Sequence, residues 1–216
     1  MKMTNSQDIA RILLEIKAVT LSPEKPYKYA SGIFSPIYTD NRLLMGYPEK
    51  RNEVIGSFEK MIKEKHIESD VIAGVASSGI PHGAWLADRL DKPFVYVRKA
   101  SKEHGKENLI EGVLGVGQKV ILVEDLISTG GSSLAAIEAI RTAGGFVDTC
   151  LAIFTYNMKK AVEGFRAADI LLYALTDFPT LIEVAADEGF IERDAAAKAI
   201  QWNQDPSGWG EKMGFE

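Results

Sequence analysis

From residue 50 onward, the apolar residues follow two patterns, helical spacing and continuous runs, which take turns along the chain. Helical spacing predicts helices over about 54–62, 81–89, 134–141 and 159–165. Between them, continuous apolar runs predict strands at 71–76, 94–98, 120–123, 147–154 and 170–174. Strands that are apolar throughout and alternate with helices are typical of a parallel sheet covered on both faces. We therefore predict an α/β fold with a mostly parallel, twisted sheet flanked by helices.

Both ends of the chain depart from this alternation. Ser6 has the character of a helix N-cap, and apolar residues follow it at helical spacing as far as Ile16. Prolines, glycines and aromatics mix irregularly over 22–48, which predicts turns and short strands. Helices are predicted over 181–187 and 193–202, before a glycine-rich tail. We expect one domain, with an N-terminal addition (1–47), an α/β core (48–180) and C-terminal helices with a tail (181–216).

Charge and cysteine content narrow the classes of partner. The formal net charge of −5 argues against sequence-independent nucleic-acid binding, but it leaves room for a local basic patch that binds a phosphorylated small molecule. Cys150 is the single cysteine, so we expect a buried, reduced thiol and no internal disulfide. No apolar run approaches the ~20 residues of a membrane span, and residues 1–8 are polar. We expect a cytoplasmic protein with no membrane partner.

The most informative segment is 119–133, a buried strand followed by two acids and a loop rich in Ser, Thr and Gly. We expect the strand to end at Glu124 and Asp125, on the edge of the sheet where α/β proteins bind ligands. Glycines and a helix N-terminus then favour a phosphate, with Thr129 and Ser132 as hydroxyl donors. The acids would face sugar hydroxyls. A capped turn with solvated acids is the alternative, which the fixed spacing between acids and loop disfavours.

Residues 120–132 resemble the binding motif for 5-phosphoribosyl-1-pyrophosphate (PRPP) in type I phosphoribosyltransferases. Glu at the first acid position is a departure, because Asp is also common there in the family, but the charge is kept. The resemblance implies that the acids bind the ribose hydroxyls and that residues 128–132 surround the 5-phosphate. The PRPP-binding residues that it implies in this motif are Glu124, Asp125, Leu126, Ile127, Ser128, Thr129, Gly130, Gly131 and Ser132.

A run of four potential cations follows the strand predicted at 94–98, namely Arg98, Lys99, Lys102 and His104. Such a run is usually a solvated face. Its spacing resembles the flexible catalytic loop of orotate phosphoribosyltransferases, which close this loop over the site of a neighbouring subunit. The resemblance implies that all four residues act in catalysis, that Arg98, Lys102 and His104 contact PRPP, and that the protein is a homodimer. Cations and Mg²⁺ would stabilise the departing pyrophosphate, and a closing loop would exclude water.

Residues 30–42 resemble the Ser-Gly-x-x-Ser-Pro-x-Tyr element in the N-terminal hood of the same enzymes, where the base is bound. The resemblance places orotate near Ser128. Arg42 either pairs with the orotate carboxylate or anchors a turn, and the sequence leaves both open.

Two positions depart from the family. Some members carry Lys where this chain has Ala30, and some carry Lys where it has Ser78, so neither contact is expected here. Residues 76–79 are still expected to offer backbone amides to the pyrophosphate.

The sequence thus predicts an enzyme of the orotate phosphoribosyltransferase family, acting in pyrimidine (UMP) biosynthesis. Its Mg²⁺ ion would be held mainly through PRPP rather than by protein side chains. A phosphoribosyltransferase for another base is the first alternative, which the basic run disfavours. A PRPP-sensing regulator that binds nucleic acid is the second, which the acidic balance disfavours.

The remaining candidate residues are interpreted structurally. His66 and His82 have no acid or cysteine at metal-ligand spacing, so surface or capping roles are expected for them. Trp85, Trp202 and Trp209 are interpreted as packing residues rather than as platforms for stacking bases.

Overall fold

The structure is a computed structural model that describes residues 5–29, 31–99 and 109–215. It divides into two compact units. The first, which we call the terminal unit, combines Met1–Lys50 with Thr176–Glu216. The second, the sheet unit, is Arg51–Leu175. The sequence did not indicate that the two ends of the chain belong together, and the expectation of one domain stays a prediction.

The sheet unit is built on a six-stranded sheet with the order β10-β9-β8-β5-β6-β7. Parallel pairing joins β5 to β6, β5 to β8 and β8 to β9, whereas β7 lies antiparallel to β6 at one edge. This confirms the predicted α/β fold with a mostly parallel sheet. The strands are β5 (Val71–Val75), β6 (Phe94–Val97), β7 (Ile110–Glu111), β8 (Lys119–Ile127), β9 (Phe146–Thr155) and β10 (Leu171–Asp177).

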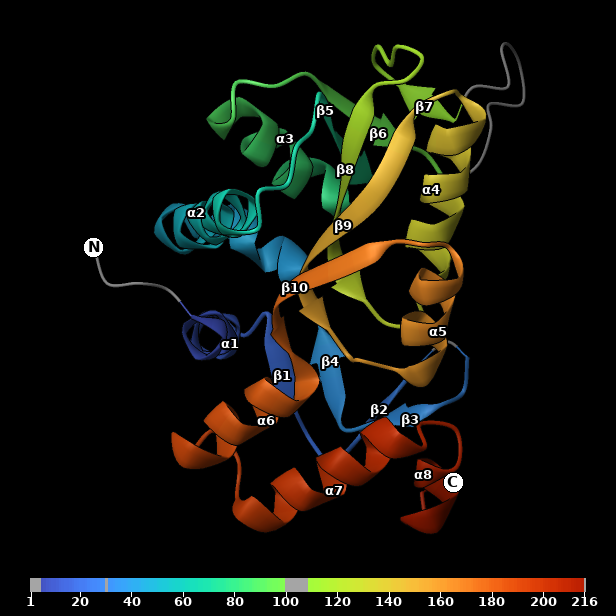
Figure 1. The fold of residues 1–216 in the computed structure, drawn as a ribbon. Coiled ribbons are helices and arrows are strands. Elements are labelled where there is room, and N and C mark those ends of the chain that lie inside the picture. The colour runs from blue at the N-terminus through green and yellow to red at the C-terminus, as the bar shows by residue number, and fades with distance from the viewer. Residues whose placement is uncertain (1–4, 30, 100–108, 216) are drawn as a thin grey trace. The chain divides into compact units, whose positions relative to one another are not determined.

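Helices cover both faces of this sheet (Figure 1). On one face, α4 (Gly131–Thr142) and α5 (Lys159–Ala167) pack against apolar side chains of the strands, which form a buried core. On the other face, α3 (Gly79–Arg89) packs against β5 and β8. Arg89 Nε in α3 donates a hydrogen bond of 2.6 Å to Glu59 Oε2 in α2 (Pro48–Glu64). Because β5 is buried at all its positions, it reads as an unbroken apolar run.

The terminal unit contains two small antiparallel sheets, in which β1 pairs with β4 and β2 pairs with β3. Trp202 and Trp209 are buried in this unit, where their indole N–H groups donate to the carbonyl oxygens of Phe34 and Lys198. The packing roles predicted for these two tryptophans are confirmed. The elements are α1 (Ser6–Glu15), β1 (Val19–Leu21), β2 (Tyr27–Lys28), β3 (Phe34–Ser35), β4 (Ile37–Thr39), the 3-10 helix η1 (Asn41–Gly46), α6 (Phe178–Asp187), α7 (Arg193–Gln204) and α8 (Trp209–Lys212).

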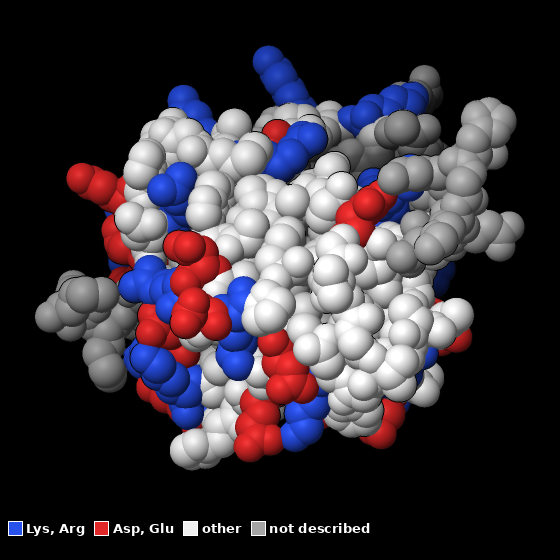
Figure 2. All heavy atoms as spheres, turned by 90° about the horizontal axis from the view of Figure 1, so that it is seen from above, with Lys and Arg blue, Asp and Glu red and all other residues white. Residues whose placement is uncertain are grey.

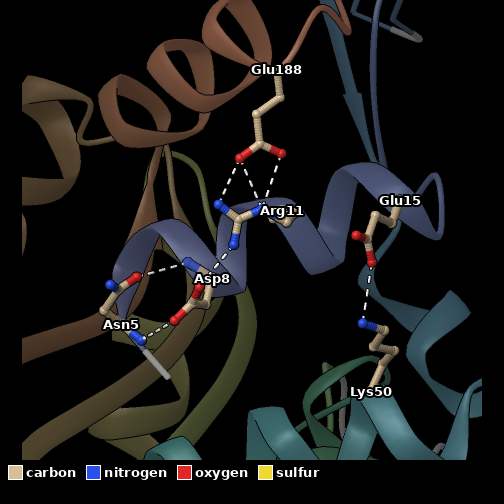
Figure 3. Close-up of polar contacts among 6 residues, drawn as sticks. All are labelled: Asn5, Asp8, Arg11, Glu15, Lys50 and Glu188. Atoms are coloured by element: carbon tan, nitrogen blue, oxygen red, sulfur yellow. Dashed lines mark hydrogen bonds and ion pairs between the residues drawn. The ribbon is translucent and has the colours of Figure 1, made fainter. Parts of the chain in front are cut away.

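Helix α1 begins one residue earlier than its sequence suggested (Figure 3). Asn5 Oδ1 accepts from the amide of Asp8 over 2.9 Å, and Asp8 Oδ2 accepts from the amide of Asn5 over 3.0 Å, so Asn5 is the N-cap. Ser6 instead donates its hydroxyl to Thr176 Oγ1. Arg11 bridges Asp8 and Glu188, which ties α1 to the end of α6 inside the terminal unit.

Most of the predicted elements are present, and three differences concern the less regular parts of the chain. β8 continues beyond the expected strand, β7 was not predicted, and the glycine-rich tail contains the short helix α8. None of the helices in the described part of the chain is long and apolar enough to cross a membrane.

Candidate active site

The acid pair, Glu124 and Asp125, lies inside β8 rather than at its end. β9 continues alongside it, so that Glu124 pairs with Ala152 and Ile127 pairs with Thr155. The expectation that the strand stops at the acids was wrong, because this long partner strand supplies ladder partners for two residues beyond them, Leu126 and Ile127. The strand ends at Ile127, whose carbonyl oxygen accepts from the amide of Tyr156 over 2.9 Å.

A loop over residues 128–130 connects β8 to α4, and its geometry depends on a glycine. Gly130 has φ 79°, in the left-handed region that favours glycine, and α4 starts at the next residue. A Cβ at Gly130 would also lie 3.0 Å from Phe165 Cε2. Since Gly130 has no side chain to accept from the first-turn amides of α4, these amides are available to another acceptor. A helix N-terminus of this kind favours an anion such as a phosphate.

Glu124 is the most perturbed acid of the site. Only 5% of the residue is exposed. Oε1 accepts from the amide of Asp125 over 3.2 Å, and Oε2 accepts from the hydroxyls of Ser133 and Ser132 over 3.3 and 3.4 Å. Burial first, and the neighbouring charge of Asp125 second, raise the pKa of Glu124 to about 9. Burial thus favours the neutral form of Glu124 in the free protein, and a buried and a half-buried carboxyl group side by side suit a ligand rich in hydroxyl groups.

The turn before α3 lies against the same end of β8. A Cβ placed on Gly79 would be 2.5 Å from the carbonyl oxygen of Val123 and 3.4 Å from Glu124 Oε1. The peptide bond between Ala76 and Ser77 is cis, and the amide of Ala76 donates to the carbonyl oxygen of Val97. The backbone of residues 76–79 thus lies at the carboxyl edge of the sheet, beside the acid pair.

Arg98 follows β6 at the same edge of the sheet. Its amide donates to the carbonyl oxygen of Leu109 over 2.8 Å, and its Nη1 lies 3.5 Å from Glu111 Oε1. Its neighbour Lys99 is exposed. The other two members of the basic run, Lys102 and His104, lie outside the described residues, so their catalytic roles stay predictions.

Arg42 belongs to the terminal unit, where it pairs with Asp40. Arg42 Nε and Nη2 lie 2.6 and 2.9 Å from the two carboxylate oxygens of Asp40, and the amide of Arg42 also donates to Asp40 Oδ1. The hydrogen bonds from Arg42 lower the pKa of Asp40. Arg42 therefore does anchor the turn that begins η1. Its 52% exposed side chain keeps a contact with orotate open as a prediction. Ala30 lies outside the described residues.

Four side chains outside the predicted site complete its description. His66 is exposed, as expected, but His82 is fully buried in α3, so its expected surface or capping role was wrong. Burial lowers the pKa of His82 to about 4. Cys150 is buried and free, as expected, and burial raises the pKa of its thiol. Ser133 was missed as a site residue, although it directly follows the predicted loop.

Comparison with known protein families defines the class to which this chain belongs. A model of the phosphoribosyl transferase domain matches residues 48–163, a range that contains the acid pair, the 128–132 loop and the turn before α3. The chain is thus a protein with a phosphoribosyl transferase domain.

Individual relatives narrow this class. An orotate phosphoribosyltransferase from Coxiella burnetii is 52% identical over 207 residues, which are 96% of this chain and 99% of that protein. An orotate phosphoribosyltransferase from Halalkalibacterium halodurans is 49% identical over 201 residues, 93% of this chain and 96% of that protein. This chain belongs to the orotate phosphoribosyltransferase family.

Solved structures agree with this assignment. The crystal structure of orotate phosphoribosyltransferase from Aeropyrum pernix is similar with a TM-score of 0.74 and 29% identity, over 85% of this chain and 99% of that one. Leishmania donovani UMP synthase is similar with a TM-score of 0.78 over 92% of this chain and 42% of that one, and at 24% identity it supports the fold alone.

Proposed function

We propose that this chain transfers ribose 5-phosphate from PRPP to orotate, giving orotidine 5-monophosphate and pyrophosphate in pyrimidine biosynthesis. The observation that carries the proposal is the acid pair of β8, held next to a left-handed glycine and the N-terminus of α4. The acids can bind the sugar hydroxyls of ribose 5-phosphate, and the glycine with the helix N-terminus can bind its phosphate. Membership of the orotate phosphoribosyltransferase family supports orotate as the acceptor base.

Residues of β8 and of the loop that follows bind the ribose 5-phosphate. The backbone of residues 128–132 and the first amides of α4 surround the 5-phosphate, with the hydroxyls of Thr129 and Ser132 as further donors. Asp125 accepts from a ribose hydroxyl, and its charge stabilises the positive charge that develops on the sugar as pyrophosphate leaves. Glu124 binds beside it, and a ribose hydroxyl that donates to its carboxylate favours the ionised form over the protonated one.

The departing pyrophosphate is bound by groups on the neighbouring strands. The backbone amides of residues 76–79 lie at the carboxyl edge of the sheet; that of Ala76 already donates to Val97, and those of residues 77–79 can donate to the pyrophosphate oxygens. Arg98 stands at the end of β6 and adds a cation. We assign Lys99, Lys102 and His104 to the same task from their spacing, and we expect Lys102 and His104 to reach the pyrophosphate when their loop closes.

We further propose that the reaction depends on Mg²⁺. Within the described residues, no group of three or more His, Cys, Asp or Glu side chains comes together to form a metal site. We expect the ion to be carried mainly by the diphosphate oxygens of PRPP rather than by protein side chains. When bound, such an ion neutralises charge on the leaving group.

The family motif over residues 30–42 assigns orotate binding to the hood element. We assign Ser128 to the base because it is the first residue after β8, directly beyond the ribose-binding acids. Arg42 is assigned to the carboxylate of orotate. This assignment requires Arg42 to share its guanidinium between orotate and Asp40, which already occupies Nε and Nη2.

The partners are small molecules and a second copy of the chain. The formal net charge is −5, and acidic and basic side chains are interspersed on the face drawn in Figure 2, which supports small substrates rather than nucleic acid. We propose a homodimer in which the loop carrying Lys102 closes over the neighbouring site. A cytoplasmic location fits Cys150, which is a free, buried thiol.

A base panel tests the proposed function. Purified enzyme is mixed with PRPP, Mg²⁺ and one base at a time, and ultraviolet absorbance is followed. We expect orotate to be consumed, and adenine, hypoxanthine and uracil to remain. Faster turnover of a purine than of orotate would reject the assignment, and full activity in excess chelator would reject the role of Mg²⁺.

A further inference from the structure

Ser133 is the buried polar side chain of α4. It is 0% exposed, and its hydroxyl donates to Glu124 Oε2 over 3.3 Å. A serine in a helix commonly bonds to a carbonyl oxygen of the preceding turn, whereas this one reaches across to a strand. Ser132 also donates to Glu124 Oε2, but Ser132 is exposed and can turn toward a ligand in the loop. Ser133 has no such alternative.

The Glu124 carboxyl group is therefore held at both oxygens. The amide of Asp125 binds Oε1, and this amide is fixed because β8 is paired with β9 on either side of it. The hydroxyl of Ser133 binds Oε2 from the helix. Asp125 beside it is the titratable group that acts on the pKa of Glu124, and Glu124, after burial, raises the pKa of the buried thiol of Cys150 on β9. Two serine hydroxyls donate to Oε2, and either side chain can be removed without changing a charge, but only that of Ser133 is buried against Glu124.

We propose that Ser133 is a positioning residue, which holds the Glu124 carboxylate in the direction that meets the ribose hydroxyls of PRPP. This inference rests on the proposed function, in which Glu124 binds the ribose. The hydroxyl of Ser133 acts in two ways. It limits rotation of the carboxyl group about its last side-chain bond, and as a donor it stabilises the ionised form that accepts from the ribose.

The test compares Ser133→Ala with the wild-type enzyme through the pH dependence of kcat/KM for PRPP. Because kcat/KM reports groups of the free enzyme, the rise in activity as Glu124 ionises should appear in this profile. Without the hydroxyl, the rise should move to higher pH, and kcat/KM near neutral pH should fall about tenfold, the size expected for one hydrogen bond to a charged group. Ser133→Cys, a weaker donor of similar size, should lie between Ser133→Ala and wild type.

Ser69→Ala is the matched control. Ser69 is a buried serine at the opposite end of the sheet, and its hydroxyl has no hydrogen-bond partner among the described residues. This variant removes a buried hydroxyl without touching Glu124, so its pH profile should match that of wild type. Circular dichroism and thermal unfolding of both alanine variants show whether the fold is intact.

Glu124→Gln separates the inference from the function on which it rests. We expect Glu124→Gln to abolish the rise of kcat/KM with pH. In that background, Ser133→Ala should lower kcat/KM little further, because the two residues act as one unit. If Glu124→Gln leaves kcat/KM and its profile unchanged, the ribose-binding role of Glu124 is wrong and the inference falls with it. If Glu124→Gln has its effect but folded Ser133→Ala behaves like Ser69→Ala, only the positioning role is rejected.

Discussion

Gly79 at the start of α3 lies so close to β8 that a Cβ atom there would be 2.5 Å from the carbonyl oxygen of Val123. No real side chain tolerates that distance to backbone. The absence of a side chain thus lets the turn over residues 76–79 approach the strand that carries the acid pair. In the proposed function, this contact brings the pyrophosphate-binding amides and the ribose-binding acids to one edge of the sheet.

The Gly79→Ala variant should therefore be less stable than wild type and should bind PRPP more weakly. The added methyl group pushes α3 away from β8, and overpacking of this kind costs about 1–3 kcal/mol. We expect the melting temperature to fall by roughly 2–4 °C for each kcal/mol in a chain of this length, and KM for PRPP to rise. Gly46→Ala is the control, since a Cβ at Gly46 would have nothing within 4 Å. Equal melting temperatures for the two variants would contradict the packing argument.

A second prediction concerns the pH dependence of stability. Burial raises the pKa of Glu124 from 4.5 to about 9, so between these values the folded protein holds a proton that the unfolded chain has released. The free energy of unfolding should therefore decrease as pH rises through this range, by at most about 1.4 kcal/mol per pH unit. His82 acts in the opposite direction at lower pH, because burial lowers its pKa from 6.5 to about 4. Its contribution is complete above pH 6.5 and is lost as pH falls toward 4.

Below pH 6.5, the contributions of Glu124 and His82 to the free energy of unfolding change with pH in opposite directions. Above pH 6.5, of the two, only the contribution of Glu124 still changes. Urea unfolding at several pH values from 6.5 to 9 should thus show falling stability for wild type and a flatter profile for Glu124→Gln. His82→Leu should change the acidic side of the profile and leave the alkaline side as in wild type. A Glu124→Gln profile as steep as that of wild type above pH 6.5 would mean that Glu124 is already ionised in the free protein.

The regular part of the fold followed from the sequence because its apolar residues are placed by periodicity alone. β5 is buried at every position and is therefore apolar throughout, whereas α4 buries one face and therefore has apolar residues at helical spacing. Both patterns can be recognised in one sequence. The acid pair and the glycine loop were predicted for a similar reason, since they are contiguous in sequence. Contacts between distant segments are a different matter, because no local pattern encodes them.

The length of β8 depends on β9, a separate strand that supplies hydrogen-bond partners up to Ile127. The burial of His82 depends on which face of α3 packs inward, and the buried face of α3 carries small residues, Gly79, Gly83 and Ala87, which give a weak apolar pattern. Ser133 could have been suspected, since a second serine follows Ser132 at the start of a predicted helix. Only the structure shows that this serine is buried against Glu124.

A third prediction concerns Asp125→Asn, which keeps the shape of the side chain and removes one negative charge. We expect kcat to fall by the equivalent of about 1–3 kcal/mol in transition-state stabilisation, because the charge faces the cationic sugar. The fold should survive, since Asp125 is only half-buried. Steady-state kinetics and thermal unfolding measure the two effects separately. Normal kcat together with normal PRPP binding would mean that the acid pair is structural.

The last prediction tests whether the basic loop acts on a neighbouring subunit. Lys102→Ala damages the loop, and Asp125→Ala damages the PRPP site, so each homodimer should be nearly inactive. When the two variants exchange subunits, a heterodimer forms. If the site is shared, one of its two sites carries both lesions and the other carries none. The intact site should restore up to about half of wild-type activity per heterodimer, by the symmetry of a two-fold interface.

Random exchange makes about half of the dimers heterodimers, so the mixture should reach about a quarter of wild-type activity. If the loop instead closed over the site of its own subunit, every site would keep one lesion and mixing would restore nothing. Exchange is verified by native mass spectrometry of differently tagged subunits, and mixing each variant with itself gives the baseline. Heterodimers that form without a gain in activity would reject the shared site and leave the roles of Glu124 and Asp125 untouched.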